Sequence, residues 1–154
     1  PGTGDEPLSV AQTIPNVKAV VVTTPQKMAL ADVRKSINFC KTVKVEITGV
    51  IENMSGMVCP HCNQTVDIFK TGGGEEVARE FELPFLGRIP MDPKIVMAGD
   101  DGTPYLSSDA DSPAGKAFGL VIDAIENRLP PVAAPVKLNM ASCACGGGGC
   151  STSK

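Results

Sequence analysis

Apolar and polar positions fall in blocks along the chain, and these blocks predict strands alternating with helices. Two continuous apolar runs predict strands over residues 17–24 and 45–54, and such runs are typical of strands buried on both faces. A shorter run that ends in proline predicts a third strand over residues 84–90. Apolar residues that recur every three or four positions predict helices over residues 26–43, 72–83 and 112–129. The alternation predicts an α/β fold, a parallel sheet with helices on both faces.

Local signals support several of these element ends. Ser112 is suited to cap a helix, and Pro113 fits the first helical position. Asp92 can cap a helix in the same way. Glu75 and Glu76 fall in the first turn of the helix predicted over residues 72–83, where the helix dipole favours negative charge.

Polar, proline and glycine residues follow each predicted strand. These exits are "TTPQ", "ENMSG" and "RIPMDP". Because ligands of parallel α/β sheets bind beyond the carboxyl ends of the strands, we expect the functional site there. Residues 24–26 either line that cleft or simply end the first strand.

Composition narrows the functional classes. A net charge of −3 disfavours nucleic acid or an anionic membrane as a main partner, since both recruit clustered Lys and Arg. At residue 130 the composition changes to Pro, Ala and Gly, which divides the chain into a folded part, residues 1–129, and a flexible tail, residues 130–154. The opening "PGTGDEPLSV" lacks an initiating Met and predicts a loop inside a longer protein.

The sequence "CPHC" is the most specific chemical signal. Cys59 and Cys62 are two residues apart and can bind one metal from a single turn, as half of a tetrahedral thiolate site. A redox pair is disfavoured because "NQTVDIF" follows instead of a capped helix. Zinc held within one chain would need two more ligands, and His61 is better explained as an exposed loop residue.

The other cysteines have less definite roles. Cys40 lies on an apolar helical stripe and is expected to be a small core residue. Cys143, Cys145 and Cys150 form a cluster in the glycine-rich tail. That cluster is either an additional metal-binding segment or a set of solvent-exposed thiols.

Six motifs in order resemble one family. They are "PGTGDE", "TTPQ" with "ALADVRK", "GVIENMSG", "CPHC", "GGGEEVA" and "LGRIPMDP", and together they span residues 1 to about 129. This set resembles the Mrp-type (ApbC-like) P-loop ATPases, the iron–sulfur cluster carrier and scaffold proteins. The family belongs to the deviant-Walker group with MinD and the nitrogenase iron protein, and the cytosolic and archaeal scaffold branch is the most similar.

The resemblance implies a nucleotide site at the strand exits. Asn53 would recognise the adenine base, with Pro90 and Asp92 as the opposite wall of the pocket. Gly2 would approach the γ-phosphate, and Asp5 would contact a partner across a dimer. ATP and magnesium are the implied cofactors of the full-length protein.

The resemblance also implies where the rest of the metal site lies. A second copy, or a paralogue, would contribute its own pair, so that Cys59 and Cys62 hold half of a [4Fe–4S] cluster that bridges a dimer. Zinc is a possible substitute, because it accepts the same tetrahedral sulfur ligands.

One family feature is absent from this sequence. The phosphate-binding loop, a glycine-rich run ending in Gly-Lys-Ser or Gly-Lys-Thr, does not occur, and residues 72–74 cannot replace it because no such ending follows. The chain therefore resembles the C-terminal part of the ATPase domain. We do not expect it to hydrolyse ATP alone.

The expected function is that of a cytoplasmic iron–sulfur cluster scaffold or carrier. It would assemble a labile [4Fe–4S] cluster and transfer it to recipient apoproteins, coupled to ATP binding and hydrolysis in the full-length protein. The alternative is a non-enzymatic, zinc-bridged dimerisation module. A MinD-like membrane-positioning ATPase is least favoured, because "ASCACGGGGC" is not an amphipathic basic helix.

Overall fold

The computed structural model describes residues 3–59, 62 and 64–129. The tail of residues 130–154, with its three cysteines, lies outside this range, as do Gly2 and His61. In chain order the elements are α1 (Asp5–Thr13), β1 (Lys18–Thr23), α2 (Lys27–Thr42), β2 (Glu46–Val58), β3 (Thr65–Val66), α3 (Gly73–Glu80), β4 (Phe85–Met91), α4 (Pro93–Asp100), α5 (Tyr105–Asp109) and α6 (Pro113–Glu126).

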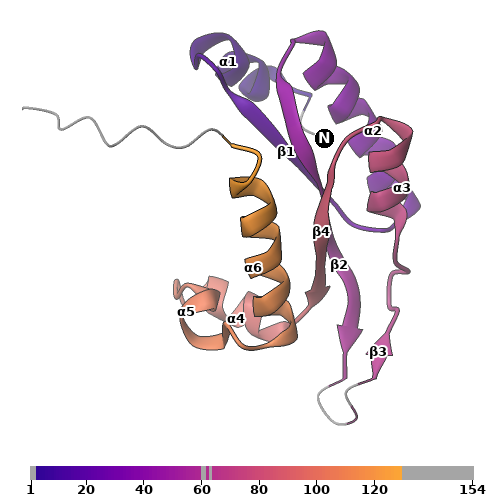
Figure 1. Ribbon diagram of the computed structural model, residues 1–154, viewed down its shortest axis with the longest axis vertical. Helices are drawn as coiled ribbons and strands as arrows, with labels where there is room; N and C mark the ends of the chain where they lie inside the picture. The colour runs from indigo at the N-terminus through magenta and orange to yellow at the C-terminus, as the bar shows by residue number, and fades with distance from the viewer. Residues whose placement is uncertain (1–2, 60–61, 63, 130–154) are drawn as a thin grey trace, which may run out of the picture.

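The long strand β2 is the centre of the sheet (Figure 1). It pairs in parallel with β1, where Val21 lies opposite Val50, and in parallel with β4, where Asn53 lies opposite Ile89. Beyond the end of β1, β2 pairs with the short β3 in antiparallel orientation. The predicted parallel sheet is confirmed, with one antiparallel pair added to it.

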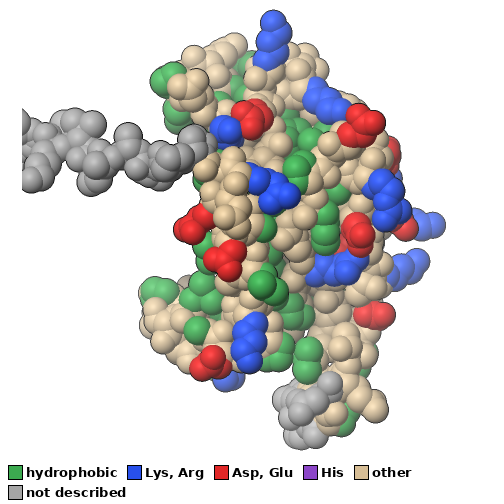
Figure 2. All heavy atoms as spheres, in the orientation of Figure 1, with side chains coloured by type: hydrophobic (Ala, Val, Ile, Leu, Met, Phe, Trp, Pro, Cys, Tyr) green, Lys and Arg blue, Asp and Glu red, His purple; other side chains and the backbone are tan. Residues whose placement is uncertain are grey.

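Helices cover both faces of the sheet, as predicted (Figure 1). Consecutive residues of β2 point to opposite faces, so Val50 packs with α2 and α3 while Ile51 packs with β4 and α6. Each face thus has its own apolar cluster. Figure 2 shows charged side chains concentrated over the α2 and α3 side, where Arg34 of α2 pairs with Glu80 of α3.

Two side-chain caps confirm the predicted helix starts. The Asp92 carboxylate accepts the backbone N–H of Lys94 at 2.9 Å at the start of α4. The Ser112 hydroxyl accepts the N–H of Gly115 at 2.9 Å at the start of α6, and a proline follows each cap. Each proline stands at a first-turn position where a backbone N–H would have no acceptor within the helix. Because proline has no N–H, no helical hydrogen bond is lost there.

The structure differs from the prediction in two segments. Residues 5–13 form α1, where the sequence predicted a loop, because Asp5 and Glu6 favour a helix start and Pro7 is tolerated in a first turn. Strand β2 continues to Val58, past the exit expected at residue 54, and forms a hairpin with β3. In the described part of the chain, no helix combines the length and apolarity needed to cross a bilayer.

Candidate functional site

A bulge in β2 shapes the strand exit at Asn53. Between Asn53 and Met57, β2 advances four residues while β4 advances two, from Ile89 to Met91. Two extra residues must therefore be accommodated, and Met54 adopts a positive φ of 55°. The Asn53 side-chain oxygen accepts the Met54 N–H at 2.9 Å, which leaves the side-chain NH2 as its donor group.

Asn53, Pro90 and Asp92 line one pocket of about 310 Å³. Most of its remaining wall is apolar and comes from Met54, Met57, Met91, Pro93, Ile95 and Val96. The structure thus brings together the three residues predicted to hold adenine. An apolar slot with a few polar groups at its edge is suited to a flat heteroaromatic ring.

A hydrogen-bond network fixes the Asp92 side of this pocket. One Asp92 oxygen caps α4, and the other accepts the hydroxyl of Tyr105 at 2.6 Å. The Tyr105 oxygen also lies 2.7 Å from the Ser112 hydroxyl that caps α6. Burial, followed by the bond to Asp92, raises the pKa of Tyr105. The network joins the starts of α4 and α6 through α5.

An ion pair on the surface supports the same unit. The Lys94 ammonium contacts the Asp109 carboxylate at 2.5 Å, which links α4 to the end of α5. This hydrogen bond lowers the pKa of Asp109 and raises the pKa of Lys94. Lys94 is exposed to solvent and Asp109 is half-buried, so the contribution of this surface ion pair to stability is small.

The predicted metal ligands lie where β2 and β3 connect. The backbone N–H of Cys59 donates to the Gln64 carbonyl at 2.9 Å, which closes this connection just beyond the two strands. Cys59 is half-buried and Cys62 is exposed. Among the residues that the structure describes, no three His, Cys, Asp or Glu side chains converge as a metal site.

Cys40 does not join this pair. It lies on α2 and is half-buried, so it is not the core residue that the sequence predicted, and burial raises the pKa of its thiol. A thiol with a raised pKa is a poor nucleophile and a poor metal ligand.

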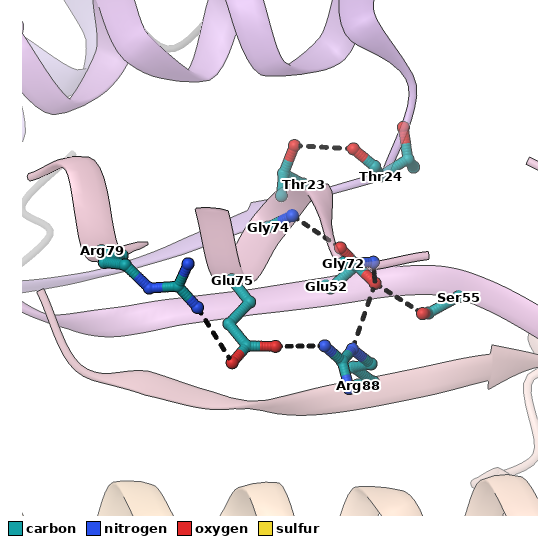
Figure 3. Close-up of polar contacts among 9 residues, drawn as sticks. All are labelled: Thr23, Thr24, Glu52, Ser55, Gly72, Gly74, Glu75, Arg79 and Arg88. Carbon is teal, nitrogen blue, oxygen red and sulfur yellow. Dashed lines mark hydrogen bonds and ion pairs between the residues drawn. The ribbon is translucent and has the colours of Figure 1, made fainter. Parts of the chain in front are cut away.

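Glu52 is the residue that the sequence reasoning missed. It lies on β2 immediately before Asn53 and is fully buried. Its carboxylate accepts the N–H groups of Gly72 at 2.9 Å and Gly74 at 2.5 Å at the start of α3 (Figure 3). A glutamate inside an apolar strand run was the available signal, because a buried carboxylate requires partners.

This arrangement explains why residues 72–74 are not a phosphate-binding loop. Gly72 adopts a φ of 91°, a conformation that favours glycine, and it presents its N–H inward. A helix N-terminus of this kind attracts anions, but here the anion is the protein's own Glu52. Glu52 thus occupies the N–H groups of Gly72 and Gly74 that a phosphate would need.

Charged residues extend this cluster to the surface. Arg88 of β4 lies 3.5 Å from the Glu52 carboxylate through its Nε and also pairs with Glu75 of α3. Glu75 in turn lies 3.6 Å from Arg79 (Figure 3). The cluster ties β2, β4 and α3 together at the residue of β2 that precedes Asn53.

The site described here does not test the predictions made for Gly2, near the γ-phosphate, and for Asp5, in contact with a partner across a dimer. Gly2 lies outside the described residues. Asp5 is exposed and begins α1, which lies beside the amino end of β1, away from the strand exits (Figure 1). Their assignment remains a prediction.

Similarity to characterised proteins supports the picture given by the fold. Residues 1–126 match the family model described as ParA: NUBPL iron-transfer P-loop NTPase. An iron-sulfur cluster carrier protein of Methanocaldococcus jannaschii is 46% identical over 130 residues, which cover 84% of this chain and 44% of that protein. A cytosolic Fe-S cluster assembly factor NUBP2 of Bos taurus is 41% identical over 133 residues, 84% of this chain and 49% of that protein.

Solved structures lead to the same fold. A nucleotide-binding protein from Archaeoglobus fulgidus in complex with ADP is 39% identical, with a TM-score of 0.57 over 66% of this chain and 42% of that chain. The cell division ATPase MinD of Pyrococcus furiosus is 25% identical, with a TM-score of 0.55 over 73% of this chain and 43% of that one. The chain spans slightly less than half the length of the relatives it matches. As the resemblance of its motifs predicted, the chain belongs to the NUBPL-type iron-transfer P-loop NTPases of the ParA group.

Proposed function

We propose that this chain is the part of an iron–sulfur cluster carrier that holds the cluster and contacts adenine. The observation that carries the proposal is the course of β2. This single strand passes the Asn53 pocket and then delivers Cys59 to the hairpin end. The names of the relatives, an iron-sulfur cluster carrier and Fe-S cluster assembly factors, support this assignment.

The cluster is the cargo of this protein. Cys59 and Cys62 supply two thiolates, whereas a [4Fe–4S] cluster is commonly held by four. A second copy or a paralogue would supply the other pair, and the exposure of Cys62 leaves the site open to such a partner. A cluster shared between two chains can be released to a recipient apoprotein by a small change in their separation.

The pocket between β2 and α4 is proposed to hold the adenine of ATP. The Asn53 NH2 would donate to a ring nitrogen, and Pro90 with the methionines would pack on the ring faces. The phosphates and magnesium would be bound by the full-length protein, since Glu52 already occupies the start of α3. Gly2 and Asp5 keep their proposed roles near the γ-phosphate and the partner chain. The carrier would act in the cytoplasm.

Anaerobic reconstitution with iron and sulfide tests the cysteine assignment. Wild type and the control Cys40→Ala should incorporate iron and sulfide and become dimeric. The double variant Cys59→Ala/Cys62→Ala should remain monomeric and without a cluster. Equal cluster content in the double variant and wild type would remove these cysteines from the scheme. A dimer that forms with zinc but takes up no iron and sulfide would favour the zinc-bridged dimerisation module.

A further inference from the structure

Residues of both candidate sites lie on one excursion of the chain that extends beyond the end of β1. It leaves at Glu52, continues along the end of β2, returns along β3 and ends at Gly72, where α3 begins. Asn53, Cys59 and Cys62 all belong to this excursion. Its returning strand is held by little pairing, because β3 pairs with β2 at only two of the described positions, Met57 with Val66 and Val58 with Thr65. The outgoing strand also pairs with β4, at Asn53 and Met57. A two-stranded hairpin of this size is not stable by itself in water.

The Glu52 carboxylate joins the two ends of the excursion. Its Oε1 accepts the Ser55 hydroxyl at 2.5 Å on the outgoing strand and the Gly72 N–H at 2.9 Å on the returning segment. Its Oε2 accepts the Gly74 N–H at 2.5 Å inside α3 (Figure 3). The base of the excursion is therefore closed by one side chain that bonds to both of its ends.

Charge makes this closure sensitive to substitution. A buried carboxylate is stable only with several donors around it, and Glu52 has these three and the Arg88 guanidinium at 3.5 Å. A neutral amide of the same size cannot accept from all of them, because its NH2 group would face donors. One or more buried N–H groups would then lose their partner.

We infer that Glu52 is a positioning residue that holds the base of the cysteine-bearing hairpin closed. Loss of hydrogen bonds to Glu52 should make the hairpin mobile while the sheet and its covering helices stay folded. The consequence for cluster retention rests on the proposed function: a mobile hairpin would hold its half of the cluster less firmly.

Hydrogen–deuterium exchange of the metal-free chain tests this closure. The variant is Glu52→Gln, and the control is Glu80→Gln, the same change at an exposed site of α3 that pairs with Arg34. In Glu52→Gln, peptides from residues 54–58 and 65–70 should exchange about tenfold faster, the effect of losing hydrogen bonds to a charged group. Peptides from α2 and α6 should match wild type. Acceleration throughout the chain, or none at the hairpin, would overturn the inference.

Ser55→Ala provides a second variant if Glu52→Gln does not fold. It removes one donor to Oε1 and leaves the two glycine N–H groups bonded. Faster exchange should again be confined to the hairpin, with a smaller increase. Exchange equal to wild type at the hairpin would count against the inference.

Iron release from the reconstituted protein tests the link to the cluster. Transfer of iron to a chelator should be faster from Glu52→Gln than from Glu80→Gln. If wild type takes up no cluster, the proposed function fails while the exchange result still decides the role of Glu52. If the cluster forms and both variants release iron at one rate, the link between hairpin closure and cluster retention is wrong.

Discussion

Tyr105 offers a direct measurement at the residue scale. It is the only tyrosine, and the chain has no tryptophan, so phenolate absorbance reports this side chain alone. Because burial and the bond to Asp92 raise its pKa, an alkaline titration of the folded chain should have its midpoint above the ordinary value of about 10. The native state then keeps a proton that the unfolded chain loses, so the free energy of unfolding should fall as pH rises above about 10.

Asp92→Asn is the matched control for this titration. Asparagine caps a helix about as well as aspartate, so α4 should keep its start. The negative charge beside the phenol disappears, and the midpoint should move down toward that of the denatured chain. A wild-type midpoint at or below the denatured value would contradict the hydrogen-bond network described here.

At this scale, the sequence allowed specific predictions where the chemistry is local or the motif familiar. Asn53, Pro90 and Asp92, assigned to one pocket from the family resemblance, do line a common pocket. The cap formed by Asp92 followed from its position before a proline. Glu52 was missed because its partners, Gly72 and Gly74, lie twenty or more residues away, and no local pattern announces them.

At the scale of an element, two glycines of α6 provide a matched pair of substitutions. A Cβ on Gly115 would lie 2.3 Å from the Asp109 carbonyl oxygen, so Gly115→Ala should force α5 away from α6. A Cβ on Gly119 would meet nothing within 4 Å, so Gly119→Ala should stabilise the helix by up to about 1 kcal/mol.

Urea unfolding followed by far-UV circular dichroism measures both variants. Gly115→Ala should unfold at lower urea concentration than wild type, with a loss of at least about 1 kcal/mol from overpacking. We therefore expect the urea midpoint to fall for Gly115→Ala and to rise for Gly119→Ala, although both are the same change in one helix. A gain in stability for Gly115→Ala would show that the contact between α5 and α6 is not as close as described.

The elements themselves were predictable to different degrees. Helices cover both faces of the first part of β2, which explains its apolar run. The run that became β1 was predicted to be buried on both faces, and this is wrong for one face, where Val20 and Val22 are exposed. The end of β2 was not predictable, since the polar residues after Ile51 resemble a loop and the bulge has no simple pattern. Helix α1 was hidden by Pro and Gly residues that usually mark turns.

At the scale of the whole molecule, the described residues leave one region of the sheet uncovered. Within the described residues, β1 is an edge strand, with β2 as its only partner. On the face covered by α6, that helix packs on β4 and β2, and Val20 and Val22 of β1 remain 39% and 54% exposed. An open strand edge beside exposed valines favours association with another chain.

Val22→Lys should therefore reduce self-association of this chain at high concentration. Burying one valine contributes about 1.5–3 kcal/mol, so the association constant should fall about tenfold or more. Sedimentation velocity over a concentration series measures this association constant. Leu120→Lys is the control, because Leu120 is 70% exposed and belongs to helix α6, not to a strand. An equal effect of both substitutions would mean that exposed apolar area alone drives association.

The continuity of β2 also has a mechanical consequence. Cys59 follows Asn53 by six positions along nearly continuous strand, so the two residues are separated by at most about 20 Å. The outer part of the strand then acts as a lever whose pivot is the bulge at Met54. A rotation of about 10° at such a pivot would displace the far end by about 3 Å, comparable to the rise of one strand residue. A small tilt at the Asn53 pocket would thus be enlarged at the thiols into a movement longer than a metal–sulfur bond of about 2.3 Å.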